Sequence, residues 1–331
     1  MTTTNSGRLA GSKVYVAGHR GLAGSAILRR LQREGCKSIV TRSHRELDLT
    51  DQGAVSRFFQ EERPEYVFLA AAKVGGILAN NNFPAEFIEQ NLSIQSNVIT
   101  AAHATGVKRL LFLGSSCIYP RDCAQPIREE YLLSGPLEST NRSYAIAKIA
   151  GIEMCSAFNR QYCAKFMAAM PTNLYGPNDN YDLASSHVLP ALVRKMHEAK
   201  MAHLPEVSVW GTGCVRREFL HSDDMADACV FLLSLSDELY RGIANSDSHP
   251  PLINVGCGED LTIRELAELI REVAGYSGRL VFDISKPDGT PQKLLDVSRL
   301  KRIGWQSSIP LQEGLSRTYR EFAATYSATQ V

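Results

Sequence analysis

A glycine pattern between an apolar run and an amphipathic stretch constrains the fold of this chain more than any other feature. The run KVYVAG begins at Lys13, and the GxxGxxG pattern ahead of SAILRRLQREG consists of Gly18, Gly21 and Gly24. This order predicts a strand, a tight turn and a helix that ends near Gly35. Such glycines let the backbone approach a pyrophosphate, whose charge meets the free N–H groups of the helix N-terminus. An ordinary turn would carry the same glycines, but in this strand–turn–helix context they predict a dinucleotide-binding site.

Apolar runs and helical stretches alternate through the first half of the chain. The runs lack polar alternation, as strands buried on both faces do, and they lie at 13–18, 38–42, 66–72, 109–116 and 166–173. Between them, 84–106 has helical periodicity, and Thr50 is placed to cap a helix that Pro64 would end. Strands that alternate with helices at this spacing predict an α/β fold with a Rossmann-type, doubly wound parallel sheet.

The pattern changes after about Tyr175. The stretch GPNDNYDLASSH is rich in Pro, Asn, Asp and Ser, which predicts a loop, and the elements beyond it are shorter. They include the apolar INVG at 253–256 and a helical stretch at 262–275. We expect a smaller α/β C-terminal substrate-binding lobe beside the sheet. The expected boundaries are 12–180 for the Rossmann domain with a returning segment near 216–236, 181–322 mainly for the lobe, and flexible tails at 1–11 and 323–331.

Charge, cysteine usage and hydropathy exclude several classes of protein. The formal net charge is +1, so no global basic field attracts nucleic acid or an anionic membrane. The 8 cysteines include no CxxC pair, which argues against a zinc site, and free thiols suit a reducing compartment. The start MTTTNSGRLAGS lacks the apolar core of a signal peptide, and no apolar run approaches the ~20 residues of a membrane span. We therefore expect a cytoplasmic protein that binds small molecules, with no metal, nucleic acid or membrane partner.

The residues after the second predicted strand bear on the choice of dinucleotide. A site for NAD usually carries an acidic residue there, but this chain has Arg42, His44 and Arg45, and Arg20 lies inside the glycine loop. Guanidinium groups suit a 2′-phosphate, although such cations also serve simply to solvate a loop. The cluster predicts NADP(H) rather than NAD.

Tyr144 and Lys148 form a YxxxK pattern within a stretch of helical periodicity, so both side chains fall on one helix face. A nearby ammonium favours the phenolate, which would let such a tyrosine exchange a proton with a substrate oxygen near neutral pH. YxxxK alone is common on exposed helices. The upstream GSSCIYP strengthens the prediction, because it places Ser115 at the carboxyl end of a predicted strand, where ligands bind in this architecture.

With these residues in view, the chain resembles the extended short-chain dehydrogenase/reductase family from about residue 13 to residue 322. Within that family it is most similar to the enzymes that act on GDP-4-keto-6-deoxy-D-mannose. The resemblance rests on several segments taken together, which are GHRGLAGSAI, LAAAKVGGI, GSSCIYP, YAIAKIAG, MPTNLYGPNDN, SHVLPAL, REFLHSDDMAD and SKPDGTPQKLLD. It implies epimerisation of the keto sugar at C3 and C5, followed by reduction at C4 with NADPH.

The resemblance assigns Ser115, Tyr144 and Lys148 to the reduction, and it assigns Cys117 and His187 to the epimerisation as an acid/base pair. Removing a proton beside a ketone from one face and returning one to the other requires two titratable groups. Cys and His both titrate nearer to neutrality than most side chains. The alternatives are a small buried thiol for Cys117 and a simple helix-start residue for His187.

The resemblance also implies the residues that contact the two ligands. Those for the cofactor are Gly18, Arg20, Gly21, Leu22, Gly24, Arg42, His44, Arg45, Leu113, Gly114, Ser115, Ser116, Tyr144, Lys148, Pro171, Asn173, Leu174 and His187. Those for the substrate nucleotide are Lys195, Trp210, Arg217, Asp288 and Lys293. Cations suit a pyrophosphate and an aromatic face suits a base. Lys195, His44 and Gln292 each stand where relatives often have Arg, which bears on affinity rather than on the reaction class.

The resemblance implies a homodimer as well, because family members commonly pair two helices per subunit; here these are expected at 84–105 and 142–162. Other functions on the same fold stay open. A nucleotide-sugar 4,6-dehydratase would carry acidic residues after the serine pair, where this chain has Cys117 and Ile118, and a 4-epimerase would hold NAD tightly. A non-enzymatic NADP sensor would tend to lose the Tyr and Lys that are present here.

Overall fold

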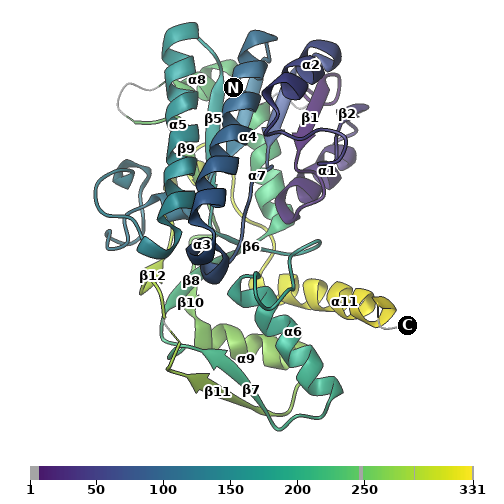
Figure 1. Ribbon diagram of the computed structural model, residues 1–331, viewed down its shortest axis with the longest axis vertical. Coiled ribbons are helices and arrows are strands. Elements are labelled where there is room, and N and C mark those ends of the chain that lie inside the picture. Colours follow the sequence, from purple (N-terminus) through teal and green to yellow (C-terminus); the bar gives the residue numbers. More distant parts are fainter. Residues whose placement is uncertain (1–6, 246–248, 287, 330–331) are drawn as a thin grey trace.

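The computed structural model describes residues 7–245, 249–286 and 288–329, and it places them in two lobes, one above the other in Figure 1. Within these residues the upper lobe is built on a 6-stranded parallel sheet in the order β2-β1-β3-β4-β5-β9. The strands are β1 Lys13–Ala17, β2 Ser38–Val40, β3 Tyr66–Leu69, β4 Arg109–Leu113, β5 Phe166–Pro171 and β9 Leu252–Val255. Because β2 and β3 lie on opposite sides of β1, the switch point of this doubly wound sheet lies between β1 and β3.

Helices cover both faces of this sheet because alternate residues of each strand point to opposite sides. Tyr15 and Ala17 pack on the face covered by α2, α4 and α5, whereas Val14 and Val16 pack on the face covered by α1 and α7. Figure 1 shows α4 and α5 side by side in front of the sheet. The helices of this lobe are α1 Leu22–Arg33, α2 Gln52–Glu62, α3 Ile77–Asn82, α4 Pro84–Ala104, α5 Arg142–Tyr162, α7 Ser222–Ser234, α8 Asp237–Ala244 and α10 Ser298–Arg302. This architecture confirms the predicted fold class.

The lower lobe has its own apolar core between short strands and helices. Its strands are β6 Asn173–Tyr175, β7 Glu206–Trp210, β8 Arg216–His221, β10 Asp260–Thr262, β11 Arg279–Asp283 and β12 Gln292–Lys293, and its helices are α6 Val188–Met201, α9 Ile263–Ala274 and α11 Leu311–Thr329. β8 pairs with β6, β10 and β12, and β7 pairs with β11. Met196, Leu266 and Leu315 bring the three helices together in this core. A capping box of Thr262 and Glu265 starts α9.

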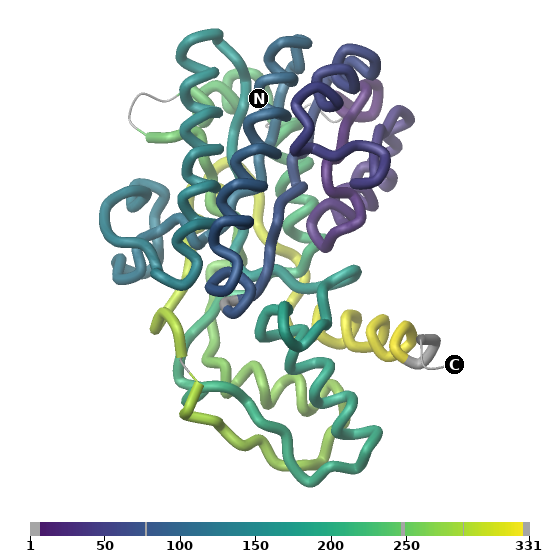
Figure 2. The backbone as a smooth tube through the Cα atoms, viewed as in Figure 1, coloured from purple at the N-terminus to yellow at the C-terminus, as the bar shows by residue number. Residues whose placement is uncertain are grey.

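The chain passes between the lobes more than once, so the division is less simple than the sequence suggested (Figure 2). The strand expected in the smaller lobe at 253–256 is instead β9 of the upper sheet. It joins that sheet because it is apolar and buried, and it pairs with β5, with Leu252 opposite Ala168. Leu300 and Trp305 are also buried in the upper core. The predicted returning segment at 216–236 is therefore wrong at both ends, because 216–221 form β8 of the lower lobe and the return extends through α8 and β9.

Two local features also differ from expectation. The residue that caps α2 is Asp51, whose carboxylate accepts a hydrogen bond from the Ala54 backbone N at 2.9 Å, while the Thr50 hydroxyl donates to Asp48. An aspartate suits this position because its charge complements the helix dipole. In the expected tails, 323–329 continue α11 and Leu9 is buried in the upper core. Residues 1–6 and 330–331 lie outside the described residues.

In the part of the chain that the structure describes, no helix has both the length and the apolar character that a membrane crossing requires. The same residues contain no group of 3 or more His, Cys, Asp or Glu side chains arranged to hold a metal ion.

Candidate active site

The glycine loop after β1 leaves room for an anion at the start of α1. Gly18 has a φ of +84°, and a Cβ there would lie 2.7 Å from the backbone N of Ala71, just after β3. A Cβ on Gly24 would lie 2.1 Å from the Gly18 carbonyl oxygen, so only glycine lets the helix approach the turn this closely. At Gly21 the nearest non-adjacent atom would be 3.7 Å away. α1 has no side-chain cap and no acidic residue in its first turn, so its unpaired N–H groups can bind phosphate.

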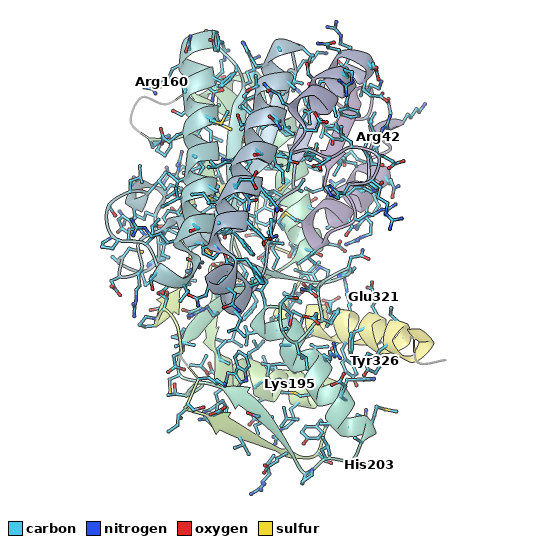
Figure 3. The ribbon with its side chains drawn as sticks, viewed as in Figure 1. Arg42, Arg160, Lys195, His203, Glu321 and Tyr326 are labelled. Carbon is cyan, nitrogen blue, oxygen red and sulfur yellow. The ribbon has the colours of Figure 1, made fainter. Side chains whose placement is uncertain are left out.

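Of the cations predicted beside this loop, one forms an ion pair and the others are exposed to solvent. Arg42 forms an ion pair with Glu62 of α2 at 2.5 Å, and its guanidinium lies 5.4 Å from the centre of the Phe58 ring. Figure 3 shows Arg42 at the side of the upper lobe. The other predicted cations are exposed, and they are Arg20, His44 and Arg45. The ion pair with Glu62 competes with a phosphate for the Arg42 guanidinium.

Ser115, Tyr144 and Lys148 come together where β4 ends. Ser115 follows the strand by two residues, and its side chain is hydrogen-bonded to that of Tyr144 from α5. One turn further along this helix, Lys148 Nζ donates a hydrogen bond to the Leu113 carbonyl oxygen at 2.8 Å. The ammonium lies 5.7 Å from the centre of the Tyr144 ring. The end of β4 and the first turns of α5 therefore assemble the three predicted side chains at the carboxyl edge of the sheet.

Burial controls the ionisation of these groups. It raises the pKa of the Tyr144 phenol well above its usual range, nearby Cys117 raises it further, and the hydrogen bond to Ser115 acts in the opposite direction. Burial also lowers the pKa of the Lys148 ammonium to about 7. The sequence predicted a phenolate favoured by the lysine, whereas the burial of Tyr144 opposes a phenolate. At neutral pH Tyr144 is a protonated hydroxyl that can donate to an oxygen gaining negative charge.

Lys293 brings the two groups predicted for epimerisation into one environment. Its Nζ lies 3.8 Å from the Cys117 sulfur, which also accepts a hydrogen bond from Asn141 Nδ2 at 3.2 Å. On the neighbouring strand, Arg217 stands opposite Lys293, and it is close enough to Cys117 for their charges to interact. His187 comes just before α6 and reaches solvent. The surrounding protein, and to a lesser degree Lys293, lower the pKa of its imidazole, so the ring is neutral at neutral pH and can accept a proton.

The remaining predicted nucleotide contacts lie in the lower lobe. The Trp210 ring is 47% exposed, and two ammonium groups, those of Lys195 and Lys286, each lie 5.4 Å from its centre. Figure 3 shows Lys195 in this lobe. The Asp288 carboxylate accepts hydrogen bonds from Thr212 N at 2.8 Å and from Thr212 Oγ1 at 2.9 Å. Asp288 therefore shapes the turn between β7 and β8, while Trp210 stays partly exposed between two ammonium groups.

Known proteins resemble this chain over most of its length. A model of the NAD dependent epimerase/dehydratase family matches residues 14–245, which is more than half of the chain. The chain belongs to the NAD dependent epimerase/dehydratase family. GDP-L-fucose synthase 1 of Arabidopsis thaliana is 56% identical over 308 residues, covering 93% of this chain and 92% of the relative. GDP-L-fucose synthase of Escherichia coli (strain K12) is 55% identical over 310 residues, covering 94% and 96%.

A solved structure gives a further comparison. It is a GDP-mannoheptose C4 reductase from Campylobacter jejuni with NADP bound, and its sequence is 39% identical to this chain. The match covers 98% of this chain and 99% of that chain, with a TM-score of 0.85.

In this epimerase/dehydratase family member, the remaining predicted cofactor residues lie at the start of α1, at the carboxyl ends of β4 and β5, where ligands bind in such sheets, and in β6, which follows β5 directly. They are Leu22, Leu113, Gly114, Ser116, Pro171, Asn173 and Leu174. One of them is already engaged, since Asn173 Nδ2 donates to the Glu218 carbonyl oxygen of β8 at 2.8 Å. That bond holds the chain after β5 against the lower lobe.

Two side chains that contact predicted site residues were not predicted from the sequence: Asn141 contacts Cys117, and Lys286 contacts Trp210. Asn141 stands at the N-cap position of α5, where asparagine commonly bonds to the helix backbone. Here its side chain makes no cap hydrogen bond and donates to the Cys117 sulfur instead. Its position three residues before Tyr144 was the only sequence signal. Lys286 had none, because its neighbour Trp210 is distant in the sequence.

Proposed function

We propose that this chain converts GDP-4-keto-6-deoxy-D-mannose into GDP-L-fucose by epimerisation at C3 and C5 and then reduction of the C4 ketone with NADPH. The observation that carries the proposal is the position of Cys117, which lies against Lys293 on one side and influences the ionisation of Tyr144 on the other. Proton-transfer groups beside a proton donor for a carbonyl oxygen are what an epimerase/reductase of a keto sugar requires. The names of the Arabidopsis and Escherichia coli relatives support the same reaction.

The residues present fit NADP(H). The glycine turn and the uncapped start of α1 would hold its pyrophosphate. The exposed Arg20 and Arg45 would meet its 2′-phosphate, together with Arg42 once it leaves Glu62. When bound, NADPH supplies the hydride that C4 receives.

Epimerisation moves protons on the carbons beside the ketone. Neutral His187 can take a proton and, once protonated, return one, and Cys117 serves as the second proton-transfer group. Ser115 can donate a hydrogen bond to the ketone oxygen, which stabilises the enolate that forms on the sugar. Lys293 balances negative charge on the Cys117 sulfur while the proton is away.

Reduction turns the C4 ketone oxygen into a hydroxyl. Tyr144 donates the proton that this oxygen requires, and Ser115 orients the oxygen. As Tyr144 loses its proton, the Lys148 ammonium stabilises the phenolate from across the helix turn. The Leu113 carbonyl oxygen holds Lys148 in place for this role.

A pH profile is expected to report Lys148. Its pKa of about 7 means that the ammonium is present below that pH and is lost above it. The value of kcat/KM for NADPH, which reports the free enzyme, should therefore fall as the pH rises through about 7. Lys148→Arg stays protonated, so in this variant the fall should move to higher pH. A wild-type profile without this fall would show that the charge of Lys148 is not required.

Cofactor choice is expected to depend on Arg42 and Arg45. Replacing both with glutamine should raise the KM for NADPH by roughly tenfold or more and leave the KM for NADH nearly unchanged, because only NADPH carries the 2′-phosphate. Arg45→Gln alone should account for most of the effect, since Arg42 is paired with Glu62. Steady-state kinetics with both cofactors decides. Equal effects on NADPH and NADH would remove the cluster from 2′-phosphate recognition.

We also propose an oligomeric state and a cellular compartment for this protein. We propose a homodimer through α4 and α5, supported by the exposed Ile146 and Tyr162 on α5, which are 38% and 49% exposed. Light scattering on the purified protein measures its mass directly.

All of the cysteines are free, which supports a reducing compartment such as the cytoplasm.

The direct test of the function is incubation with GDP-4-keto-6-deoxy-D-mannose and NADPH, with the product identified by NMR. GDP-L-fucose is the expected product. Reduction without epimerisation would instead indicate a plain C4 reductase, and binding of NADPH without any turnover would indicate a sensor.

A further inference from the structure

One fully buried carboxylate, that of Glu218, joins three segments around the site. Its side chain is 0% exposed, and its two oxygens each accept a backbone N–H: Oε1 from Gly258 at 2.7 Å and Oε2 from Leu295 at 3.0 Å. Gly256 lets the backbone come this close, because a Cβ there would lie 2.2 Å from Oε1. Burial raises the pKa of Glu218, and the hydrogen bonds to its carboxylate, those from the backbone of Gly258 and Leu295 above all, oppose this effect.

The segments that Glu218 joins carry the groups of the epimerisation site. Glu218 directly follows Arg217 in β8, and Leu295 lies two residues after Lys293 of β12. Gly258 lies just beyond β9, the last strand of the upper sheet. β12 is only 2 residues long and pairs with β8 at Gln292 and Lys293. A strand this short needs a further anchor to hold its register.

Other bonds tie this segment to the upper lobe rather than to β8. Leu294 N donates to Gln125 Oε1 at 2.9 Å, and Ile127 N donates to the Leu294 carbonyl oxygen at 2.7 Å. The Glu218 carboxylate holds the same segment to the strand of Arg217 two residues beyond the pairing of Lys293 with that strand. Together with the β8–β12 pairing, it therefore helps to set how Lys293 stands relative to Arg217 and to the Cys117 sulfur, which is 3.8 Å from Lys293 Nζ.

We propose that Glu218 is a positioning residue that holds Lys293 against Cys117 and thereby supports proton transfer at the epimerisation site. The proposal rests on the proposed function for its role in turnover. The position of Lys293 relative to the sulfur can nevertheless be measured without any substrate.

The test uses Glu218→Gln, which keeps the size of the side chain but turns one oxygen into an NH₂ group. Because both oxygens accept N–H groups, this NH₂ must face a donor, and one backbone bond is lost. We expect iodoacetamide to alkylate Cys117 several-fold more slowly, because the sulfur loses its ammonium neighbour. Peptide mass spectrometry resolves this rate, and the exposed Cys163 at the far end of α5 serves as the internal reference.

A double variant separates positioning from general loosening. Lys293→Met should slow Cys117 alkylation by itself, and adding Glu218→Gln to it should cause no further slowing, because both changes remove the same neighbour. The KM for the nucleotide sugar should rise by roughly tenfold in Glu218→Gln, whereas the Kd for NADPH should stay within about twofold. An additive effect in the double variant would overturn the proposal.

Asp224→Asn is the matched control. Asp224 is 3% exposed and also accepts two backbone N–H groups, from Ser308 at 3.0 Å and Ile309 at 2.9 Å, but both bind Oδ2, Oδ1 accepts the Ser308 hydroxyl at 2.9 Å, and the site lies in a different part of the fold. Only Glu218→Gln should change the reactivity of Cys117. Equal changes in the two variants, or an unchanged Cys117 rate in Glu218→Gln, would contradict the proposal.

If Glu218→Gln does not fold, Glu218→Asp provides the same readouts, because it keeps the charge and shortens the reach. Its expected alkylation rate lies between those of the wild type and Lys293→Met, and a wild-type rate would contradict the proposal. Failure of the chain to convert the GDP-linked keto sugar would contradict the proposed function alone. The Cys117 measurement would still decide the role of Glu218.

Discussion

Cys117→Ser and His187→Asn are each expected to slow the exchange of the C3 and C5 protons of the substrate with deuterated water by roughly 10²–10⁴, the usual contribution of a positioned acid or base. Each variant removes one of the two proton-transfer groups and leaves Ser115, Tyr144 and Lys148 in place. The Cys117 variant should then reduce the unepimerised keto sugar, which gives GDP-6-deoxy sugars other than fucose. NMR of the substrate in D₂O without NADPH measures the exchange directly.

The alternative for Cys117 is a packing role, and a second cysteine controls for it. Cys123 is also half-buried and lies near enough to Lys293 for the ammonium to influence its pKa, which burial raises. Cys123→Ser should leave the exchange intact, because this thiol has no assigned proton to move. Undiminished exchange in both the Cys117 and His187 variants would exclude them from epimerisation, and the plain reductase would become the better function.

Tyr144→Phe is expected to have the opposite effect. Hydride transfer should fall by roughly 10²–10⁴ because the C4 oxygen loses its proton donor. Deuterium should still enter the substrate, since Cys117 and His187 are unchanged. The variant keeps the ring, whose centre lies 6.2 Å from that of Phe87 in an edge-on contact, so the fold and the binding of NADPH should be retained. Stopped-flow absorbance follows NADPH oxidation, and fluorescence titration gives its affinity. Reduction at a near-native rate would remove Tyr144 from the mechanism.

The two sets of variants therefore separate the half-reactions qualitatively. Cys117→Ser and His187→Asn should lose exchange and keep reduction. Tyr144→Phe should lose reduction and keep exchange. A protein in which Cys117, His187 and Tyr144 act only through general stability would show both losses together in each variant.

The order of elements around the cofactor was predictable because each signal is local. The glycines after β1 require a turn, and the periodicity after them requires a helix, whatever the rest of the chain does. The YxxxK spacing likewise places Tyr144 and Lys148 on one helix face through helical geometry alone. β9 was different, because its 4 buried residues can join any sheet that offers an edge, and only pairing with β5 assigns it.

The ionisation of the site could not be predicted in the same way. The sequence showed a lysine near a tyrosine, which by itself favours a phenolate. The structure buries Lys148 and Tyr144 together, so the pKa of the first falls to about 7 and that of the second rises. Desolvation depends on every neighbouring atom, and the neighbours come from α4, α5 and β4 at once.

The sequence by itself determined the secondary structure of the Rossmann sheet, the glycine turn and the YxxxK pair, because these depend on residues within a few positions of one another. The roles predicted for Cys117 and His187 came from the resemblance to a known family. Only the tertiary structure decided which of these side chains meet. Lys293 reaches the Cys117 sulfur across 176 positions of sequence, and Arg42 pairs with Glu62 instead of standing open to a phosphate. Contacts of this kind are set by the packing of whole elements against each other, and no local pattern in the chain encodes them.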